Sequence, residues 1–530
     1  MNKTERIAVA ALFVLLIAWS YFGRYFSPPP PAPTAETTTV AAPAPTAAPA
    51  AVAAGTDAGV EPSTNQTPMA VTPPRSEGAV PVDPAPVEET VVRQSPEAQI
   101  VVSNAVMQVA FTSWGGGIAS VTLNEFNATM EPESGPVVFD YAERTSLSYK
   151  GLPGLSEANT FAIEPMSGAT GVLISATSDS GLTLERTAVL EAGYAFTVVD
   201  RLSNRSEKPL SIRGMALQAG AMRNLESGPS IKGTDTIGVD VLLADTEKVD
   251  YLGSKLSGLF GAGGGFGCSR PDTRGMKLYA EDQFTGSIGW VAVKSKFFTQ
   301  IIEPLDGGAT SVQYRASRVA GSSAFDLESV SAVLSLPDIM IDPGQVIERR
   351  VRYYAGPKNY TLLKDEGNRR ADIMEFGRFF KPVCVVLLPL LNWIESHIPG
   401  GFGIAIILLT VIVKLVFWPV THKGTESMKR MQQLQPEIKK LREKYKSDPK
   451  KLQEKQMLLY REHKVNPLAG CLPMLIQIPV FIGLFTVLRS AVELRFSSFL
   501  WIRDLSEPEG LLAGSIPYLS SGLNILPLLM

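Results

Sequence analysis

The chain has 530 residues, enough for several domains, and a formal net charge of −3 at pH 7. The charge is uneven, because residues 421–466 carry +7 and residues 27–401 carry −12, and this balance gives no reason to expect nucleic-acid specificity. The three cysteines lie far apart, which argues against a disulfide framework or a zinc motif, and no metal or cofactor is expected.

The chain begins with an apolar segment that we expect to cross a membrane. Residues 7–22 carry no charge and follow two basic residues. A cleaved secretory signal is the alternative, but Tyr21 and Phe26 lie where a cleavage site needs small residues. We therefore predict an uncleaved anchor over 1–26, with its N-terminus in the cytoplasm.

A tether follows the anchor. Residues 27–97 are rich in Pro, Ala and Thr and contain no aromatic residue. Such a segment cannot bury enough apolar surface to offset the entropy of an ordered chain, so we predict a disordered linker.

Residues 98–356 have the pattern of an all-β domain. Apolar residues alternate with polar ones at strand period, and turn clusters separate the runs. We predict a large antiparallel β-sandwich. Because residues 27–401 contain a single histidine, His397, catalysis by a Ser/His/Asp or Cys/His arrangement is nearly excluded there. The strands and turns that carry the prediction are Tyr194–Val198, Trp290–Val293, Arg349–Tyr354, Trp114–Gly117 and Asp342–Gly344.

Residues 357–401 are predicted to connect the sandwich to the membrane part. Their apolar core, Pro382–Leu391, is short for a membrane span and contains two prolines. If it crossed, the basic segment 421–466 would lie outside, against the positive-inside rule. We therefore expect a helix that lies flat in the interface on the outer face of the same membrane.

The segment 402–420 is predicted to span the membrane inward, since nineteen residues of helix cover about 28 Å. The basic segment 421–466 follows as a cytoplasmic helical hairpin, with a turn at Ser447–Pro449 and a kink at Pro436. Its apolar stripe consists of Met428, Met431, Leu434, Ile438, Leu441 and Tyr445.

A further span is predicted over 468–492, with Gln477 at its centre, and an external loop over 493–521. The residues 522–530 begin another apolar run that is too short to cross. We expect the run to be the start of a fourth span, in a protein longer than this sequence.

Lys414 interrupts the apolar segment 402–420, and two interpretations remain open. Its long side chain can snorkel toward the cytoplasmic headgroups. Alternatively, it faces a water-containing cavity among the helices, with Thr410 one turn away on the same face and Gln477 on the next span.

A dense series of motifs lies between Phe402 and Arg503 and just beyond. They are T-x-x-x-K at 410–414, Trp418-Pro419, Leu434-Gln-Pro436, Tyr460, Val465-Asn-Pro467, Gly470-Cys-Leu-Pro473, Leu475–Pro479, Val492–Arg495 and Trp501–Leu505. With these motifs the segment resembles the YidC/Oxa/Alb membrane-insertase family, and the β-domain resembles its Gram-negative form. The resemblance implies a multi-domain membrane protein with an α-helical transmembrane insertase core and a large periplasmic β-supersandwich.

The resemblance implies a non-enzymatic insertase and chaperone of the bacterial inner membrane, acting alone or with the Sec translocon. Its clients would be nascent integral membrane proteins, which enter a hydrophilic groove open to the cytoplasm and to lipid. Lys414 matches the groove position that is usually arginine, and Thr410 and Gln477 match groove-lining positions. The hairpin matches the region that receives clients, ribosomes or signal-recognition targeting factors, through Lys439, Lys440, Arg442, Lys444, Lys450 and Lys451.

Two other function classes remain as alternatives. One is a membrane-anchored periplasmic carbohydrate-binding protein, in which the β-domain carries the function. The other is an ion-coupled transporter with Lys414 as a counter-ion site, although more spans and internal repeats are expected of that class.

Overall fold

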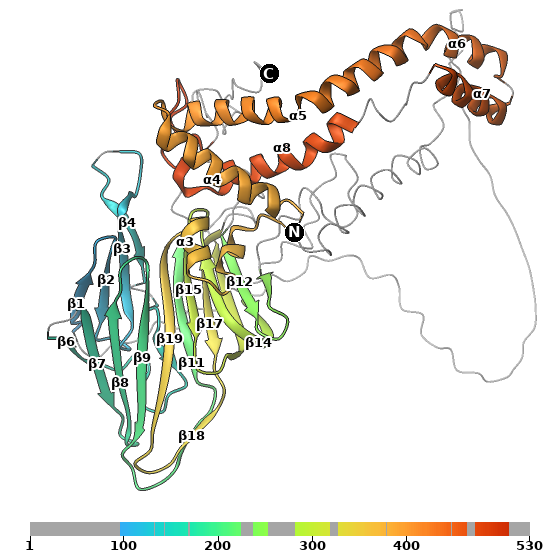
Figure 1. Ribbon diagram of the computed structural model, residues 1–530. Helices are drawn as coiled ribbons and strands as arrows, with labels where there is room; N and C mark the ends of the chain where they lie inside the picture. The colour runs from blue at the N-terminus through green and yellow to red at the C-terminus, as the bar shows by residue number, and fades with distance from the viewer. Residues whose placement is uncertain are drawn as a thin grey trace, which may run out of the picture. The chain divides into compact units, whose positions relative to one another are not determined.

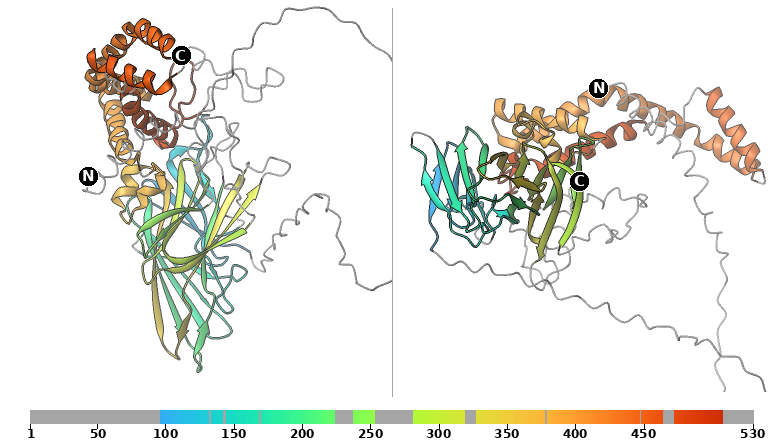
Figure 2. Two further views of the ribbon diagram at one scale, coloured as in Figure 1. Left: turned by 90° about the vertical axis from the view of Figure 1, so that its right-hand side faces the viewer. Right: turned by 90° about the horizontal axis from the view of Figure 1, so that it is seen from below.

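The computed structural model describes residues 96–131, 133–141, 144–167, 170–223, 237–252, 281–318, 327–377, 379–446, 448–463 and 472–507 (Figure 1). The predicted anchor at 1–26, nearly all of the predicted tether and the final apolar run at 522–530 lie outside these residues. Within them, an antiparallel β-domain is followed by a group of helices (Figures 1 and 2).

The β-domain consists of antiparallel strands in three sheets, which confirms the predicted all-β class. β1–β4 form one sheet in sequential order, and β10 pairs with β18. The large sheet has the order β5-β11-β17-β16-β14-β15-β19-β9-β8-β7-β6, with β12 on β14 and β13 on β12. The strands are β1 Gln99–Ser103, β2 Met107–Thr112, β3 Ile118–Asn127, β4 Pro136–Asp140, β5 Tyr149–Lys150, β6 Ala162–Pro165, β7 Gly171–Thr177, β8 Leu182–Leu190, β9 Ala195–Asn204, β10 Leu210–Ile212, β11 Ala216–Arg223, β12 Gly238–Leu243, β13 Lys248–Leu252, β14 Glu281–Lys294, β15 Phe298–Pro304, β16 Ala309–Arg318, β17 Leu327–Ser335, β18 Ile339–Ile341 and β19 Val346–Pro357.

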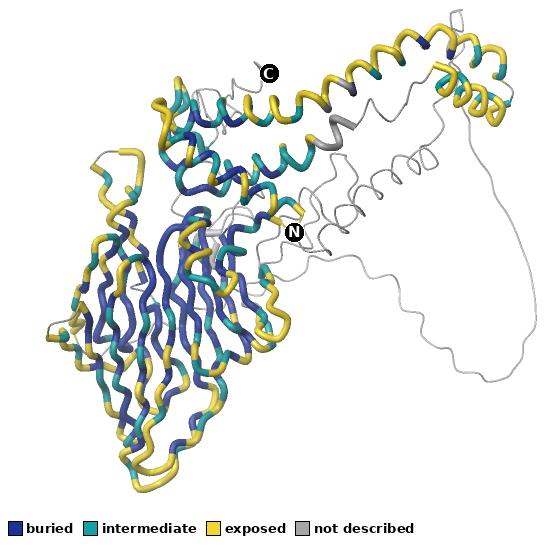
Figure 3. The backbone as a smooth tube through the Cα atoms, in the orientation of Figure 1, coloured by how far each residue is buried: buried dark blue, intermediate teal, exposed yellow. Residues whose placement is uncertain are grey.

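The alternation in the sequence corresponds to the two faces of β9. Phe196 and Val198 are fully buried, whereas Arg201 on the opposite face is exposed. This is the period-two pattern of a strand with one face in the core. Figure 3 shows that the β-domain is largely buried along its strands and exposed in its loops.

The segment Trp290–Val293 in β14 departs from this pattern, because all four residues are buried. A strand buried on both faces needs a second covering layer. The connector after β19 supplies it: α3 (Tyr360–Asp365) and the short helix η2 (Arg370–Met374) lie against the sheet, and the Trp290 indole N–H donates to the Asn368 carbonyl at 2.8 Å.

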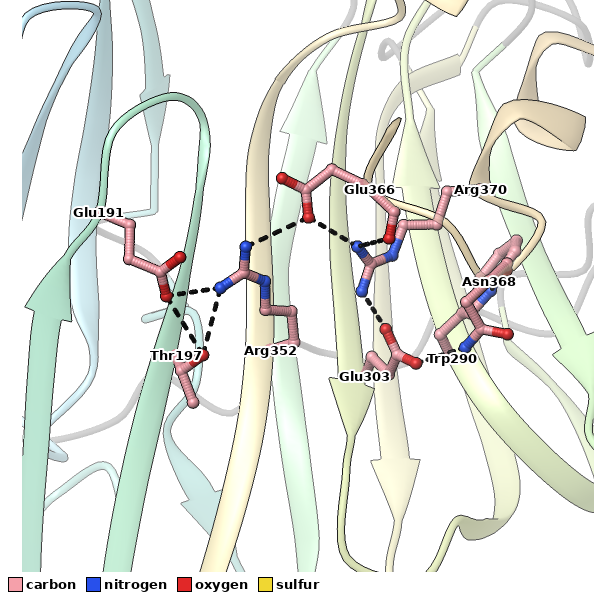
Figure 4. A network of polar contacts seen from close by, with 8 residues as sticks. All are labelled: Glu191, Thr197, Trp290, Glu303, Arg352, Glu366, Asn368 and Arg370. Atoms are coloured by element: carbon pink, nitrogen blue, oxygen red, sulfur yellow. Dashed lines mark hydrogen bonds and ion pairs between the residues drawn. The ribbon is translucent and has the colours of Figure 1, made fainter. Parts of the chain in front are cut away.

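A polar network fastens this connector to the sheet (Figure 4). The Arg370 guanidinium is nearly fully buried and bonds Glu303 of β15 and Glu366, the latter at 2.8 Å. Glu366 also accepts from Arg352 of β19, and Arg352 donates to Glu191 at 2.5 Å. These bonds hold the connector in one place on the sheet, so its direction toward the next helix is fixed.

A second cluster of buried charges lies at the end of the connector. The Lys294 ammonium bonds Asp240 at 2.5 Å and also bonds Glu375, while Lys358 is buried beside them. Loss of solvent around Lys358, together with repulsion from Lys294, lowers the pKa of Lys358 to about 7. Lys358 is therefore largely neutral above pH 7 in the folded state.

This shift predicts a pH dependence of stability. Between about pH 7 and 10 an unfolded Lys358 binds a proton that the folded Lys358 lacks, so the contribution of this group lowers the free energy of unfolding as the pH drops through this window. Lys358→Met should remove that component, which amounts to at most about 1.4 kcal/mol per pH unit. Urea unfolding of both proteins at pH 7, 8 and 9 measures the difference. Parallel slopes in the two proteins would contradict the prediction.

The helical part contains α4 (Lys381–His397), α5 (Gly401–Gln433), α6 (Gln435–Lys444), α7 (Pro449–Glu462), α8 (Leu472–Ser490) and the short helix η3 (Val492–Leu494). α4 packs against both α5 and α8, and α5 also contacts α8 (Figure 1). In the described residues, Gly401–Pro419 is the one helical stretch that is long and apolar enough to cross a membrane, and Gln477–Ser490 is apolar but shorter.

α5 continues as one helix past residue 420 to Gln433, with Pro419 accommodated inside it. The kink predicted at Pro436 corresponds to a break in the first arm of the hairpin: α5 ends at Gln433 and α6 begins at Gln435, so Pro436 lies in the first turn of a new helix, where its missing N–H costs nothing. The turn at Ser447–Pro449 is confirmed in its described residues: Asp448 caps α7 by accepting from the Lys451 N–H at 3.1 Å.

Candidate functional site

Lys414 and Thr410 lie in the middle of α5, within its apolar stretch. The Lys414 side chain is exposed, and the Thr410 hydroxyl donates to the Ile407 carbonyl of its own helix at 2.7 Å. Thr410 therefore satisfies its polar group locally, as threonine commonly does in apolar helices. Among the described residues, no hydrogen bond or ion pair is found for the Lys414 ammonium.

Gln477, on α8, lies at about the same depth as Lys414. Lys414 follows Gly401 by thirteen residues, and Gln477 precedes Ser490 by thirteen, so each lies about 20 Å from its helix end. α5 and α8 contact each other and run in opposite directions, so the start of α5 and the end of α8 lie on the same side (Figure 1). Gln477 is exposed. Thus the structure places Lys414 and Gln477 at one level, without a bond between them.

Packing of the three helices is uneven along their length. α4 has buried residues along its whole length, whereas α5 is buried near its start and largely exposed from about residue 411 onward. The buried apolar residues of the three helices are Cys384, Leu387, Leu388, Leu391, Ile394, Ala405, Leu409 and Val487. The large exposed apolar residues on α5 and α8 are Ile407, Val411, Ile412, Leu415, Val416, Trp418, Phe481 and Phe485. An apolar surface of this extent requires lipid or a partner to cover it.

The hairpin of α6 and α7 is held by a small apolar cluster. Leu434 and Ile438 are buried against Met431, Leu459 and Tyr460. Met428, predicted for the same stripe, is instead exposed. The basic candidates Lys439, Lys440, Arg442, Lys444, Lys450 and Lys451 are all exposed, so they give the hairpin a positively charged surface.

The segment after α8, residues 491–507, is called the outer loop below, and its contacts were not anticipated from the sequence. Glu493 accepts from Asn359 at 2.8 Å, and Arg495 donates to the Asn127 carbonyl at 2.6 Å. The available signal was two charges, Glu493 and Arg495, directly after an apolar helix. Their partners are distant in the sequence, so the pattern alone could not identify the contacts.

Comparison with known proteins gives matches over nearly the whole chain. The family model of the YidC periplasmic domain matches residues 99–383, and that of the 60Kd inner membrane protein matches residues 393–530. The membrane protein insertase YidC of Syntrophus aciditrophicus is 30% identical over 525 residues, covering 96% of this chain and 86% of the relative. That of Citrifermentans bemidjiense is 32% identical over 415 residues, covering 77% and 72%.

Solved structures give weaker matches. An active YidC insertase crystal structure has a TM-score of 0.25 and 20% identity, covering 78% of this chain and 77% of that one. A galactose mutarotase-like protein from Lactobacillus casei has a TM-score of 0.33 and 10% identity, covering 49% and 100%. At these scores the structures add nothing to the sequence matches.

The sequence matches confirm the resemblance that the motifs between Phe402 and Arg503 predicted. The two family descriptions also agree with an inner-membrane location and a periplasmic domain. The chain therefore belongs to the YidC family of membrane protein insertases.

Proposed function

We propose that the protein inserts integral membrane proteins into the bacterial inner membrane through a polar groove that opens to the cytoplasm and contains Lys414. The observation that carries this proposal is the exposed Lys414 in the middle of an apolar helix, at the same level as the exposed Gln477. A charge in a membrane-spanning helix is costly unless water or a polar partner surrounds it. A wet groove between α5 and α8 would supply that surrounding.

The groove would lower the barrier to insertion without covalent chemistry. The polar flank of a client enters the groove and is drawn to the Lys414 ammonium, so the apolar distance that it must cross becomes shorter. Acidic flanks gain most, because the attraction between opposite charges is stronger away from bulk water. The client's apolar helix leaves sideways along the exposed apolar face of α5, and partitioning into lipid completes the transfer, helped by the membrane potential.

The hairpin is the proposed entry point for clients. Its six exposed basic residues, listed above, belong to a segment of net charge +7, and the positive-inside rule assigns that segment to the cytoplasm. The same rule gives a multi-pass protein with a cytoplasmic N-terminus and the β-domain in the periplasm. Ribosomes and signal-recognition targeting factors are the proposed partners at the hairpin, and the Sec translocon is the proposed partner within the membrane.

The experiment that tests the proposal is a charge series at Lys414 in the full-length protein. Lys414→Ala and Lys414→Glu should impair the insertion of a small client with an acidic external flank into proteoliposomes. Lys414→Arg should retain activity, because it keeps the charge and adds a planar fork that suits carboxylates. Complementation of a depletion strain gives the same comparison in cells.

The matched control is Lys208→Glu, which makes the same charge change at an exposed position of the β-domain, outside α5 and the hairpin. It should leave insertion of this client close to that of the parent. Insertion of a client with a neutral flank should fall much less in the Lys414→Glu protein than insertion of the acidic client. Normal insertion of the acidic client by Lys414→Glu would refute the electrostatic role.

A further inference from the structure

The outer loop makes three sets of polar contacts. The first is with the β-domain, through Arg495. Arg495 is 8% exposed, and its guanidinium donates to the carbonyls of Asn127 and Ala128, at 2.6 and 2.9 Å. It also lies over the rings of Phe298 and Phe496, 5.4 and 4.0 Å from their centroids. A guanidinium that is both desolvated and bonded in this way holds the loop firmly to the end of β3.

The second contact joins the loop to the connector and to α4. One carboxylate oxygen of Glu493 accepts from Asn359 at 2.8 Å and from Asn392 of α4 at 3.4 Å. Asn359 is also the N-cap of α3, where its side-chain oxygen accepts from two backbone N–H groups. A single carboxylate thus links the loop, the connector and α4.

The third contact is an ion pair at the far end of the loop. Lys296, in the turn between β14 and β15, bonds Glu507 and donates to the Ser506 carbonyl at 2.9 Å. Both charged side chains are less than a third exposed, so solvent screens this pair less than it screens an ordinary surface pair.

The loop fixed by these contacts lies directly against the start of α5. A Cβ added at Gly403 would be 2.1 Å from a ring carbon of Phe499, so the ring rests on the bare helix backbone. Phe499 is held in turn by a pair of backbone bonds with Ile502, each 2.9 Å. Ala405 and Leu409, just beyond this contact, are buried.

We propose that the outer loop is a plug that closes the outer end of the space between α4, α5 and α8, and that the β-domain latches it through Arg495 and Lys296. The inference rests on the proposed function, because it gives the groove a seal toward the periplasm. Its new content is the role of the β-domain. The β-domain positions the plug, although its contacts lie far from Lys414.

The latch is tested by the accessibility of a single cysteine, in full-length protein whose natural cysteines are replaced by serine. Ile406→Cys places the thiol one turn after Gly403, on the face of α5 that Phe499 contacts, and a membrane-impermeant maleimide is added from the periplasmic side. The parent should be labelled slowly. Lys296→Glu should raise the rate severalfold, because it sets like charges against each other. The double variant Lys296→Glu/Glu507→Lys should return the rate most of the way to that of the parent.

Two controls separate the latch from general unfolding. Arg503→Gln removes a charge from an exposed position of the same loop and should leave the labelling rate unchanged, whereas Arg495→Gln should raise it. A cysteine at the exposed Leu500 should be labelled at one rate in all variants. Slow labelling of Ile406→Cys in the Lys296→Glu protein, or no recovery in the double variant, would overturn the proposal. The labelling measurement does not involve a client. A failure of the latch proposal can therefore be distinguished from a failure of the proposed function, which the Lys414 series tests.

Discussion

Replacing Arg186 by methionine is expected to cost about 3–5 kcal/mol of stability, because it leaves a buried carboxylate without its cation. Arg186 is 2% exposed and grips Asp200 with two bonds, at 2.7 and 2.8 Å. The third guanidinium nitrogen of Arg186, Nη1, donates to the carbonyls of Gly116 and Leu147, at 2.8 and 2.6 Å. The substitution therefore removes the partner of a charge and of two buried carbonyls at once.

The neighbouring tyrosine cannot replace the lost cation. Tyr149 donates to Asp200 at 2.8 Å, and burial, together with the negative charge of Asp200, raises the pKa of Tyr149 well above its usual value. It remains a neutral donor. Asp200 in the variant would keep that hydrogen bond and the charge of Arg349, its cross-strand neighbour on β19. Neither replaces a bidentate hydrogen-bonded pair with arginine.

Urea unfolding of the purified protein, followed by tryptophan fluorescence, measures the loss. The matched control is the double variant Arg186→Met/Asp200→Leu, which removes both charges and should be more stable than Arg186→Met alone. If Arg186→Met lowers the free energy of unfolding by less than about 1 kcal/mol, the Arg186–Asp200 pair does not stabilise the fold as a buried ion pair. The same conclusion follows if the double variant is less stable than Arg186→Met.

The sequence predicts the β-domain best where one face of a strand is buried and the other is exposed. β9 is such a strand, and its alternation identified both its type and its core residues, Phe196 and Val198. The segment Trp290–Val293 was also correctly predicted as a strand. Its burial on both faces depends on the connector around Asn368, nearly eighty residues later. No local pattern contains that information.

The helical part shows the same division between local and distant information. Apolar length identified α5, and spacings of three and four residues identified the hairpin core at Leu434 and Ile438. The bond from Arg495 to the Asn127 carbonyl joins positions 368 residues apart, and it exists only after the β-domain has folded. The outer loop was therefore predicted only as an external connection. Lys414 and Gln477 remain predicted site residues, supported by their common depth.

Gly403→Ala is expected to destabilise the helical part, although the same change usually stabilises a helix interior by about 1 kcal/mol. The sign reverses because the new Cβ would be 2.1 Å from the Phe499 ring, closer than any real contact. Either the ring or α5 must move, and overpacking of this kind typically costs about 1–3 kcal/mol. Thermal unfolding in detergent should show a lower midpoint for Gly403→Ala than for the parent.

The double variant Gly403→Ala/Phe499→Gly tests whether the Phe499 side chain is the cause. Glycine is needed at 499 because the Phe499 Cβ itself would be 2.6 Å from the added methyl group. Phe499→Gly alone should be destabilising, since it removes apolar contact from the start of α5. With the whole side chain gone, however, the added methyl group no longer meets residue 499, and the helix regains the usual advantage of alanine over glycine. Gly403→Ala should therefore be neutral or stabilising in the Phe499→Gly background. If it is equally harmful in both backgrounds, Phe499 does not rest on this glycine, and the outer loop is not fixed to α5 at this point.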